Sequence, residues 1–290
     1  MSDHTIESLY ERVRAQTPSH ADEADLGLVA VAPGIRVLAL RTPTLPPATR
    51  TNVYLVGPDS GPVAVVDPGS PYADQQAILD AVLGRIPIAM VLLTHHHGDH
   101  VGGAAALAAR WGVPIAAHAA TARRLVGRVA VSRTLEDDEV VHGARAIFTP
   151  GHAEGHLCFE VGGATIAGDM VAGIGTILID PSEGDMALYL ASLERLLARP
   201  AACLLPAHGP PIVDGPGKLA EYLAHRRMRE SRILDELGAT ARSTDELVAS
   251  VYRDTPKPLW PLAERSLLAH LGKLVREGRA RTAAAGRWSR

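Results

Sequence analysis

Four candidate metal ligands lie within six consecutive residues, His95-His96-His97-Gly98-Asp99-His100. Imidazole and carboxylate groups are the usual ligands of zinc and related divalent ions. Because alternate side chains point to the same side of a tight loop that leaves a strand, we expect His95 and His97 to share one ion. Asp99 and His100 are expected to reach a second ion, whereas His96 should point away and bind neither.

Three further candidate ligands follow strand-like segments in other parts of the chain. His152 stands in Thr-Pro-Gly-His, Asp169 in Ala-Gly-Asp, and His208 in Pro-Ala-His-Gly. With the histidine-rich run they make seven ligands, five His and two Asp. That number suffices for two ions, with one carboxylate on a single ion and the other shared, so the pattern predicts a two-metal site.

Two more residues are expected to support these ligands. Asp67, in Val-Val-Asp-Pro-Gly, is another carboxylate at a strand end, and we favour a role in bracing the histidine loop over a simple turn cap. His156 lies four residues after His152 and is expected to orient a ligand through a hydrogen bond. The remaining histidines have no partner pattern and are expected to be ordinary surface or core residues: His4, His20, His118, His142, His225 and His270.

The elements that must position these residues alternate between strand-like and helix-like segments. The run Ile88–Thr94 is continuously apolar, which is typical of a strand buried on both faces. It leads directly into the histidine loop, and Ala73–Leu83 before it reads as a helix. Further strands are expected over Gly34–Leu40, Asn52–Gly57, Val63–Asp67, Val113–Ala117, Val140–Phe148, Leu157–Val161, Ala164–Ala167 and Ala202–Leu205, and further helices over Val101–Arg110 and Asp185–Ala198. This mixture indicates a layered α/β fold in which helices cover sheets.

The last quarter of the chain is mainly helical in pattern, unlike the alternating strands and helices before it. A long helix is expected over Lys218–Leu237, and Ser243 with Glu246 makes a capping box at the start of a second helix. A third helix is expected over Pro261–Glu277, and the tail RARTAAAGRWSR reads as a short hairpin. Three helices and a hairpin are typical of a winged helix. We therefore divide the chain into a helical N-terminal extension (1–27), a catalytic domain (28–217) and a winged-helix-like domain (218–290).

Composition and charge agree with a globular chain of two modules. Hydrophobic residues make up 47% of the 290 residues and charged residues 21%. Residues 218–290 carry 15 Lys and Arg against 9 Asp and Glu, a net charge of +6, whereas residues 1–217 carry 14 against 23, a net charge of −9. The basic module either meets an anionic partner or is simply rich in arginine.

The same survey gives no sign of a membrane span or of a secretory signal. The N-terminal segment is charged and reads as a helix with Ile6, Leu9, Tyr10 and Val13 on one face. Only two cysteines occur, Cys158 and Cys203, which favours a reducing compartment. We therefore expect a cytoplasmic protein with no membrane partner.

In these motifs the sequence resembles the metallo-β-lactamase superfamily. The matching elements, in the family's order, are Asp67-Pro-Gly, Thr94–His100, Thr149-Pro-Gly-His152, Gly168-Asp169 and Ala207-His208-Gly209. The resemblance covers about residues 30–214 and implies a four-layer αββα sandwich with the metals at one edge between the sheets. The segments around His225-Arg-Arg-Met-Arg-Glu, Thr244-Asp-Glu-Leu and His270-Leu-Gly-Lys-Leu resemble the C-terminal domain of the lactamase-beta-like endoribonuclease subfamily, named for beta-lactamase-like protein 2.

The resemblance also implies a role for each ligand. His95, His97 and His152 look like the ligands of the first metal, and Asp99, His100 and His208 like those of the second. Asp169 looks like the bridge between them. Two zinc ions are the default cofactor, and manganese or iron are the alternatives.

Such a centre predicts a hydrolase. Two ions about 3.5–4 Å apart hold a hydroxide between them and lower the pKa of that water towards about 7. This hydroxide is expected to attack a carbonyl or a phosphorus atom while the second metal stabilises the leaving atom. Asp99 is assigned a catalytic role as well, because its carboxylate can hold the hydrogen of the attacking hydroxide.

The sequence supports four hypotheses about function to different degrees. The subfamily resemblance and the basic tail favour single-stranded RNA, with Arg226, Arg227, Arg229, Arg232 and Lys273 as phosphate contacts. The acidic catalytic domain and the low aromatic content of 4% count against RNA. The alternative is a thioester, such as an acyl-CoA, acyl-carrier or glutathione thioester, which the seven ligands with a bridging Asp169 suit equally well. A β-lactam ranks lower, because a bridging Asp is more typical of glyoxalase II. A non-catalytic DNA-binding role ranks lowest, because the third helix offers few basic residues.

Overall fold

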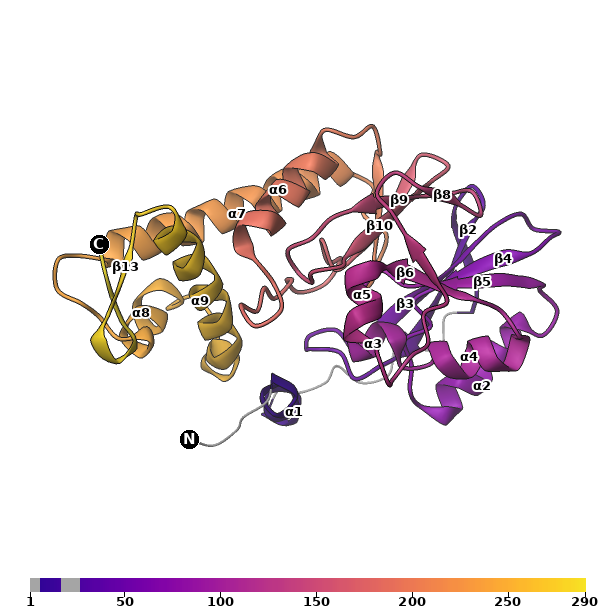
Figure 1. The fold of residues 1–290 in the computed structure, drawn as a ribbon, viewed down its shortest axis with the longest axis horizontal. Coiled ribbons are helices and arrows are strands. Elements are labelled where there is room, and N and C mark those ends of the chain that lie inside the picture. The colour runs from indigo at the N-terminus through magenta and orange to yellow at the C-terminus, as the bar shows by residue number, and fades with distance from the viewer. Residues whose placement is uncertain (1–5, 17–26) are drawn as a thin grey trace.

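Two β-sheets stacked face to face form the body of the molecule (Figure 1). The computed structural model describes residues 6–16 and 27–290. The first sheet consists, in spatial order, of β1 (Val29–Ala32), β2 (Ile35–Arg41), β3 (Arg50–Val56), β4 (Val63–Val66), β5 (Ile88–Leu92), β6 (Ile115–His118) and β7 (Arg133–Leu135). The second consists of β12 (Cys203–Pro206), β11 (Ala164–Gly168), β10 (Leu157–Val161), β9 (Ala144–Phe148) and β8 (Val140–Val141).

Helices cover the outer face of each sheet. The first sheet carries α2 (Ala73–Leu83), α4 (Ala104–Trp111) and α5 (Ala119–Arg124), and the short α3 (Gly98–Val101) precedes α4. The second sheet carries α6 (Met186–Leu197) and the first half of α7 (Gly215–Glu236). Apolar side chains of both sheets, among them Tyr54, Leu92 and Phe159, fill the space between them. The expected αββα sandwich is therefore confirmed.

The C-terminal part forms a small helical module with its own core. It contains α8 (Thr244–Val251), the 3₁₀ turn η1 (Lys257–Leu259), α9 (Trp260–Arg276) and the antiparallel strands β13 (Arg281–Ala283) and β14 (Arg287–Ser289), which flank the turn η2 (Ala284–Gly286). The capping box expected at Ser243 is present, because Ser243 Oγ accepts from the Glu246 amide while the Glu246 carboxylate accepts from the Ser243 amide. The winged-helix outline is confirmed.

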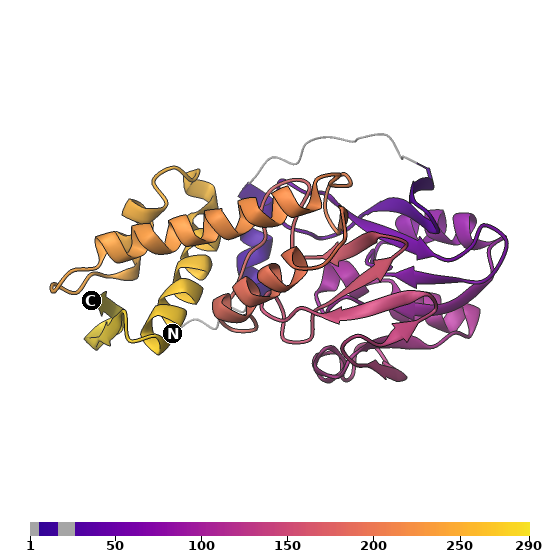
Figure 2. The same cartoon turned by 90° about the horizontal axis from the view of Figure 1, so that it is seen from above.

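The long helix α7 joins the two parts (Figure 2). Its first half contributes Leu219 and Leu223 to the core beneath the second sheet. Its second half contributes Ile233 and Leu234 to the core of the C-terminal module. One continuous helix therefore packs into two cores, and the boundary at residues 217 and 218 stays a prediction.

Two local differences from the expected elements have physical reasons. The segment Val140–Phe148 is not one strand but the hairpin β8–β9, because His142 (φ 46°) and Gly143 (φ 76°) make a tight turn with two left-handed residues. Three short elements, β1, α5 and β7, were not expected, since segments of three to six residues carry little periodicity.

At the N-terminus, α1 (Ile6–Gln16) lies against η1 of the C-terminal module. Val13, on the face expected to be apolar, is only 1% exposed. The other parts of the expected extension, residues 1–5 and 17–26, lie outside the described residues. Among the helices that the structure describes, none is both long enough and apolar enough to cross a bilayer.

Candidate metal centre

The seven candidate ligands come from loops that follow the carboxyl ends of strands in both sheets. Strand β4 runs parallel to β5, and β11 runs parallel to β12. Because β10 is antiparallel to both β9 and β11, β9 points the same way as β11. The loops after these strands therefore open at one edge of the sandwich, where the structure brings all seven residues together: His95, His97, Asp99, His100, His152, Asp169 and His208.

Asp67 holds the start of the histidine loop. Its carboxylate accepts hydrogen bonds from the Thr94 amide (2.8 Å), from Thr94 Oγ1 (2.6 Å) and from His100 Nδ1–H (2.8 Å). Its backbone is left-handed (φ 49°), a strained conformation for a residue other than glycine. Two residues on, a Cβ at Gly69 would lie 1.8 Å from the Asp99 carbonyl oxygen, so only glycine lets the two loops pack this closely.

One group of ligand atoms surrounds a first position. His95 Nε2 and His97 Nδ1 are 2.9 Å apart, and His152 Nε2 lies 3.2 Å and 3.0 Å from them. Asp169 Oδ2 is 3.4 Å from His152 Nε2. Bond lengths of 2.0–2.1 Å place neighbouring ligand atoms of a tetrahedral zinc about 3.4 Å apart. These four atoms therefore form a donor set of the right chemistry and nearly the right size.

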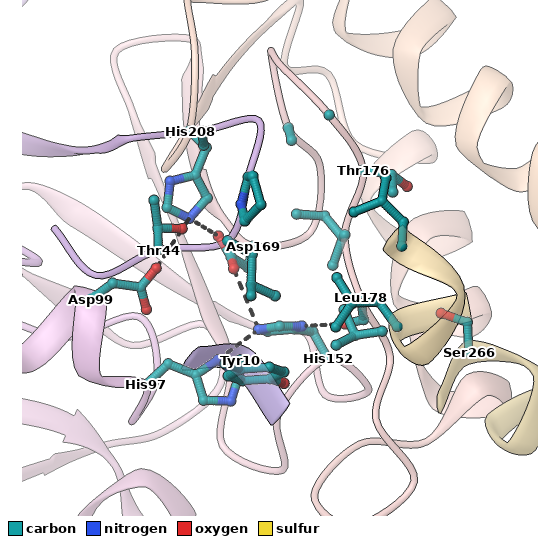
Figure 3. A pocket seen from close by; sticks show the side chains of 18 of the residues that line it. Tyr10, Thr44, His97, Asp99, His152, Asp169, Thr176, Leu178, His208 and Ser266 are labelled. Atoms are coloured by element: carbon teal, nitrogen blue, oxygen red, sulfur yellow. Dashed lines mark hydrogen bonds and ion pairs between the residues drawn. The ribbon is translucent and has the colours of Figure 1, made fainter. Parts of the chain in front are cut away.

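A second group lies on the other side of Asp169. Its Oδ1 atom is 3.5 Å from His100 Nε2 and 3.4 Å from His208 Nε2. The Asp99 carboxylate completes the group, with Oδ2 3.5 Å from His208 Nε2 and Oδ1 3.9 Å from His100 Nε2. The two oxygens of Asp169 thus face different groups, as a bridging ligand requires (Figure 3).

Each of the five histidines presents one ring nitrogen to the centre and uses the other for a hydrogen bond. His152 Nδ1–H donates to the Leu178 carbonyl and His208 Nδ1–H to the Arg50 carbonyl, both at 2.9 Å. His95 Nδ1 is 3.0 Å from Thr94 Oγ1, and His100 Nδ1 is bonded to Asp67. These partners fix the tautomer that leaves a lone pair on the inward nitrogen.

Two buried polar atoms support the fit of a cation. His100 Nε2 and Asp169 Oδ1 have no hydrogen-bond partner, although both are shielded from solvent. Buried polar atoms are nearly always satisfied, and these two face each other at 3.5 Å, too far for a hydrogen bond. A divalent ion between them would satisfy both, so the residues present fit a metal.

The electrostatics of the centre also suit a cation. Burial and the neighbouring imidazoles lower the pKa of His95 well below its usual value, and burial lowers that of His152 to about 4. Although burial opposes ionisation of Asp169, the charges of His208 and His100 hold its pKa well below the usual range. At His100 burial again opposes the charged form, but the neighbouring carboxylates, Asp169 first, raise the pKa well above its usual value. A divalent cation would replace the proton that these carboxylates hold on His100, because metal binds neutral imidazoles and ionised carboxylates.

Glu183 is a functional residue that the sequence analysis missed. Its carboxylate accepts from His97 Nε2–H at 2.8 Å and from His96 Nε2–H at 3.1 Å. Burial alone would lower the pKa of His97, but the hydrogen bond to Glu183 and the charges of Glu183, Asp99 and Asp169 together raise it. Glu183 lies in a loop of 17 residues between β11 and α6, and so long a loop in a compact domain is itself a sign of function.

His96 points away from both groups of metal-facing atoms. It bonds to Glu183, although with His97 and Glu183 it forms a third group of ligand types within 4.8 Å. His156 lies beneath the bridge, where its Nε2 accepts from the Asp169 amide (3.1 Å) and its Nδ1 bonds to Thr149 Oγ1 (2.9 Å). Each supports residues of the centre through hydrogen bonds.

A pocket of about 450 Å³ opens from this centre towards the C-terminal module. Its walls are mostly apolar and come from the loop after β2, from the loop after β11, from α1, from α7, from the segment after α8 and from α9. In Figure 3, Leu178 and Thr176 lie between the histidines and Ser266 of α9. The second module therefore completes the pocket, and His225, which we expected to be an ordinary residue, lines it.

Comparisons with known proteins agree with this architecture. The family model described as Metallo-beta-lactamase superfamily matches residues 46–208, and the model described as Beta-lactamase associated winged helix domain matches residues 243–288. A beta-lactamase domain protein from Burkholderia ambifaria has the same fold, with a TM-score of 0.78 over 93% of this chain and 97% of that one, at 24% identity.

Two relatives have names that differ in the function they suggest. The "Beta-lactamase-like protein 2 homolog" of Drosophila melanogaster is 31% identical over 80% of this chain and 84% of its own length. An "Atrochrysone carboxyl ACP thioesterase" of Claviceps purpurea is 31% identical over 71% of this chain and 67% of its own length. Since the superfamily model spans more than half of the sequence and the fold carries the matching motifs, the chain belongs to the metallo-β-lactamase superfamily of metal-dependent hydrolases.

Proposed function

We propose that this protein is a dinuclear metal-dependent hydrolase that cleaves thioesters of small acids. The observation that carries the proposal is the pocket, which is mostly apolar and is lined by candidate ligands of the metal centre. Its volume of about 450 Å³ lies in the range typical of small-molecule sites. The name of the Claviceps relative, a thioesterase, supports the same substrate class.

We further propose the metal ligands that the sequence predicts. His95, His97 and His152 would hold one ion, Asp99, His100 and His208 the other, and Asp169 would bridge them, with zinc as the default. Bound divalent ions would polarise a substrate carbonyl and supply a water that ionises near neutral pH.

The chain's own residues help to position the attacking water. Asp99 lines the pocket, and although burial opposes its ionisation, the nearby histidines lower its pKa. Its carboxylate is therefore ionised at neutral pH and can accept a hydrogen bond from the attacking water, which orients that water. A thiolate is a good leaving group, so the second half of the reaction needs no strong acid.

The alternative is cleavage of single-stranded RNA, for which five basic residues were expected to contact phosphates. In the structure these residues are paired with acidic side chains or buried. Arg227 pairs with Glu194, both Arg229 and Arg232 pair with Asp254, and Lys273 pairs with Glu230. Arg226 is only 3% exposed. These five residues therefore do not form an open basic surface for a phosphate backbone.

A DNA-binding role is weakened in the same way. The basic residues of α9 pair with acidic ones, Arg265 with Asp180 and Arg276 with Asp185. A recognition helix needs such side chains free to reach a groove. A cytoplasmic location, which rests on the two cysteines, stays a prediction.

An activity screen of the metal-loaded protein tests the proposal. The substrates are thioesters of N-acetylcysteamine, CoA and glutathione, followed by thiol release, alongside single-stranded RNA and a β-lactam. We expect thioester turnover that is absent from Asp169→Ala and retained by Asp59→Asn, an exposed carboxylate in the β3–β4 loop at the opposite edge of the sheets. Turnover of RNA or of the β-lactam alone would overturn the thioesterase assignment.

A further inference from the structure

The C-terminal module contributes polar side chains to the pocket wall. Apolar residues, with Leu45, Ile177 and Leu262 among them, also line the pocket. We call the part of the wall formed by Arg226 and Arg229 of α7 and by Tyr252, which follows α8, the far end, because none of the three belongs to the groups of candidate metal ligands. All three side chains are more than nine-tenths buried. Polar groups at this depth need partners, so their contacts decide what the pocket binds.

Arg226 is a buried cation without an acidic partner. One of its terminal nitrogens donates to the Ile177 carbonyl, and its guanidinium lies over the ring of Tyr189. Its Nε–H has no hydrogen-bond partner, and among the described residues no carboxylate forms an ion pair with it. Burying an unpaired charge is costly, so this arrangement favours an anion that arrives from outside the chain.

Tyr252 offers a second unused donor. Its hydroxyl is buried without a partner, and its ring lies under the guanidinium of Arg229, 4.6 Å from the ring centroid. Arg229 itself is already paired, since it donates to the Val251 carbonyl and to Asp254. Leaving a buried hydroxyl unsatisfied costs about 1–3 kcal/mol, which a ligand oxygen would recover.

The surroundings of His225 agree with a positive potential at this end. Arg229 Nε–H donates to His225 Nε2 at 3.4 Å, which requires a neutral ring. Burial and the charges of Arg226 and Arg229 lower the pKa of His225 to about 4. The imidazole therefore adds no positive charge of its own at neutral pH, and the unpaired guanidinium of Arg226 supplies the positive charge at this end, since Arg229 is paired with Asp254.

We propose that Arg226 and Tyr252 form a subsite for an acidic oxygen group, a carboxylate or a phosphate, at the end of the substrate remote from the metals. The ligand is then a slender molecule with one reacting carbonyl, an apolar middle and an anionic far end. The proposal deepens the thioesterase assignment and rests on it only for the reacting end.

The two ends are linked through one loop. His152 donates to the carbonyl of Leu178, and Arg226 donates to the carbonyl of the preceding residue, Ile177. The candidate metal ligand His152 and the proposed anion-binding Arg226 therefore donate hydrogen bonds to the carbonyl groups of adjacent residues. A substrate that engages both ends would be held along this loop, with its carbonyl at the centre.

A binding experiment on the metal-loaded protein tests the subsite without any need for turnover. Straight-chain monocarboxylates of six to twelve carbons are compared with dicarboxylates of the same length by calorimetry. Both can place one carboxylate at the metals, but only the dicarboxylate reaches Arg226 and Tyr252. At the length that fits, we expect the dicarboxylate to bind at least tenfold more tightly, since hydrogen bonds to charged groups contribute about 1.5–3 kcal/mol.

Variants separate binding from structure. Tyr252→Phe should reduce the dicarboxylate preference severalfold while leaving the melting temperature of the free protein unchanged or higher, because the lost hydroxyl has no partner. Arg226→Met should abolish the preference; if it does not fold, Tyr252→Phe still decides. The control Tyr72→Phe removes an exposed hydroxyl on the first sheet's side and should change nothing.

A second arm identifies the anion. Replacing the far carboxylate by a phosphonate shows whether the subsite prefers a phosphate-like or a carboxylate group, and either preference supports the proposal if Tyr252→Phe weakens it. Equal binding of mono- and dianionic ligands at every length, or a preference that Tyr252→Phe leaves intact, overturns it. If the preference stands but no thioester is cleaved, only the proposed function fails.

Discussion

The two ends of the pocket are built from different kinds of structure. At the metal end, the ligand types follow the carboxyl ends of strands in two packed sheets, and hydrogen bonds such as those of Asp67 fix them. At the far end, Arg226 and Tyr252 come from a helix and a helix end, and the Arg226 Nε–H and the Tyr252 hydroxyl have no partner. Both ends therefore keep buried polar atoms without a partner, but those of the metal end, His100 Nε2 and Asp169 Oδ1, suit a cation, whereas the donors of the far end suit an anion.

This difference separates chemistry from specificity. Sheet edges hold several side chains at fixed separations, which suits a reaction that depends on geometry. Helices of a second module can move or change sequence without disturbing those edges, so they suit the choice of substrate. The contrast predicts that substitutions at the metal end stop catalysis and that substitutions at the far end change which substrate is bound.

The largest expected effect is at the bridge. Asp169→Ala removes the one carboxylate whose two oxygens face both groups of ligand atoms. We expect thioester kcat/KM to fall by on the order of 10³-fold or more, comparable to the loss of a main transition-state stabiliser. Thiol release measures the loss, and Asp59→Asn is the control. A folded Asp169→Ala protein with more than a tenth of the original activity would contradict the assignment of catalysis to the metal end.

Glu183 should give the next largest effect, because it acts through a candidate ligand. Glu183→Ala removes the acceptor that fixes the ring of His97, and we expect metal affinity to fall about 10–100-fold. Chelator competition measures this, and Glu183→Gln should recover part of the affinity through its amide oxygen. Substitution of the exposed Glu154 by Gln is the matched control. Unchanged affinity in Glu183→Ala would show that packing alone orients His97.

His225 tests the electrostatics of the far end. Burial and the two guanidinium groups lower its pKa to about 4, below the usual value of 6.5. The unfolded chain therefore binds this proton more readily, and the stability of the native protein relative to His225→Gln should fall as the pH falls from 6.5 towards 4. NMR titration of the imidazole gives the pKa directly. A midpoint near 6.5 would contradict a positive potential at this end.

The smallest expected effect concerns the helical module alone. Ser243→Ala removes the N-cap of α8 and should cost about 1 kcal/mol in the free energy of unfolding. Thioester kcat should stay unchanged, because the sheets hold the metal end. Ser250→Ala, in the last turn of the same helix, is the control and should be neutral or slightly stabilising. A large loss of kcat in Ser243→Ala would show that the two ends are not independent.

The metal end could be predicted from the sequence because its signal is local. Each ligand follows a strand-like run, and the His95–His100 segment carries four ligand types in six residues. The roles of Asp67 and His156 were also expected, and the structure places both in hydrogen bonds with the residues they were expected to support. The layered α/β fold and the three C-terminal helices followed from periodicity and capping signals in the same way.

The far end could not be predicted from the sequence because its residues come together only through tertiary packing. In the sequence Arg226 and Arg229 belong to a basic helix and were expected to contact phosphates, and nothing local shows that α7 packs them into a pocket. Tyr252 marks only a helix end in the sequence. Glu183 was missed for a similar reason, since it lies in a turn whose approach to His97 depends on how the two sheets meet.

The central claim is that the sheet edge binds two divalent ions, one on each side of Asp169. The most direct test is the metal content of zinc-reconstituted protein, measured by native mass spectrometry after free metal is removed. The account predicts two ions per wild-type chain and a loss of the second ion in His208→Ala. A wild-type chain that holds one ion or none at saturating zinc would contradict it.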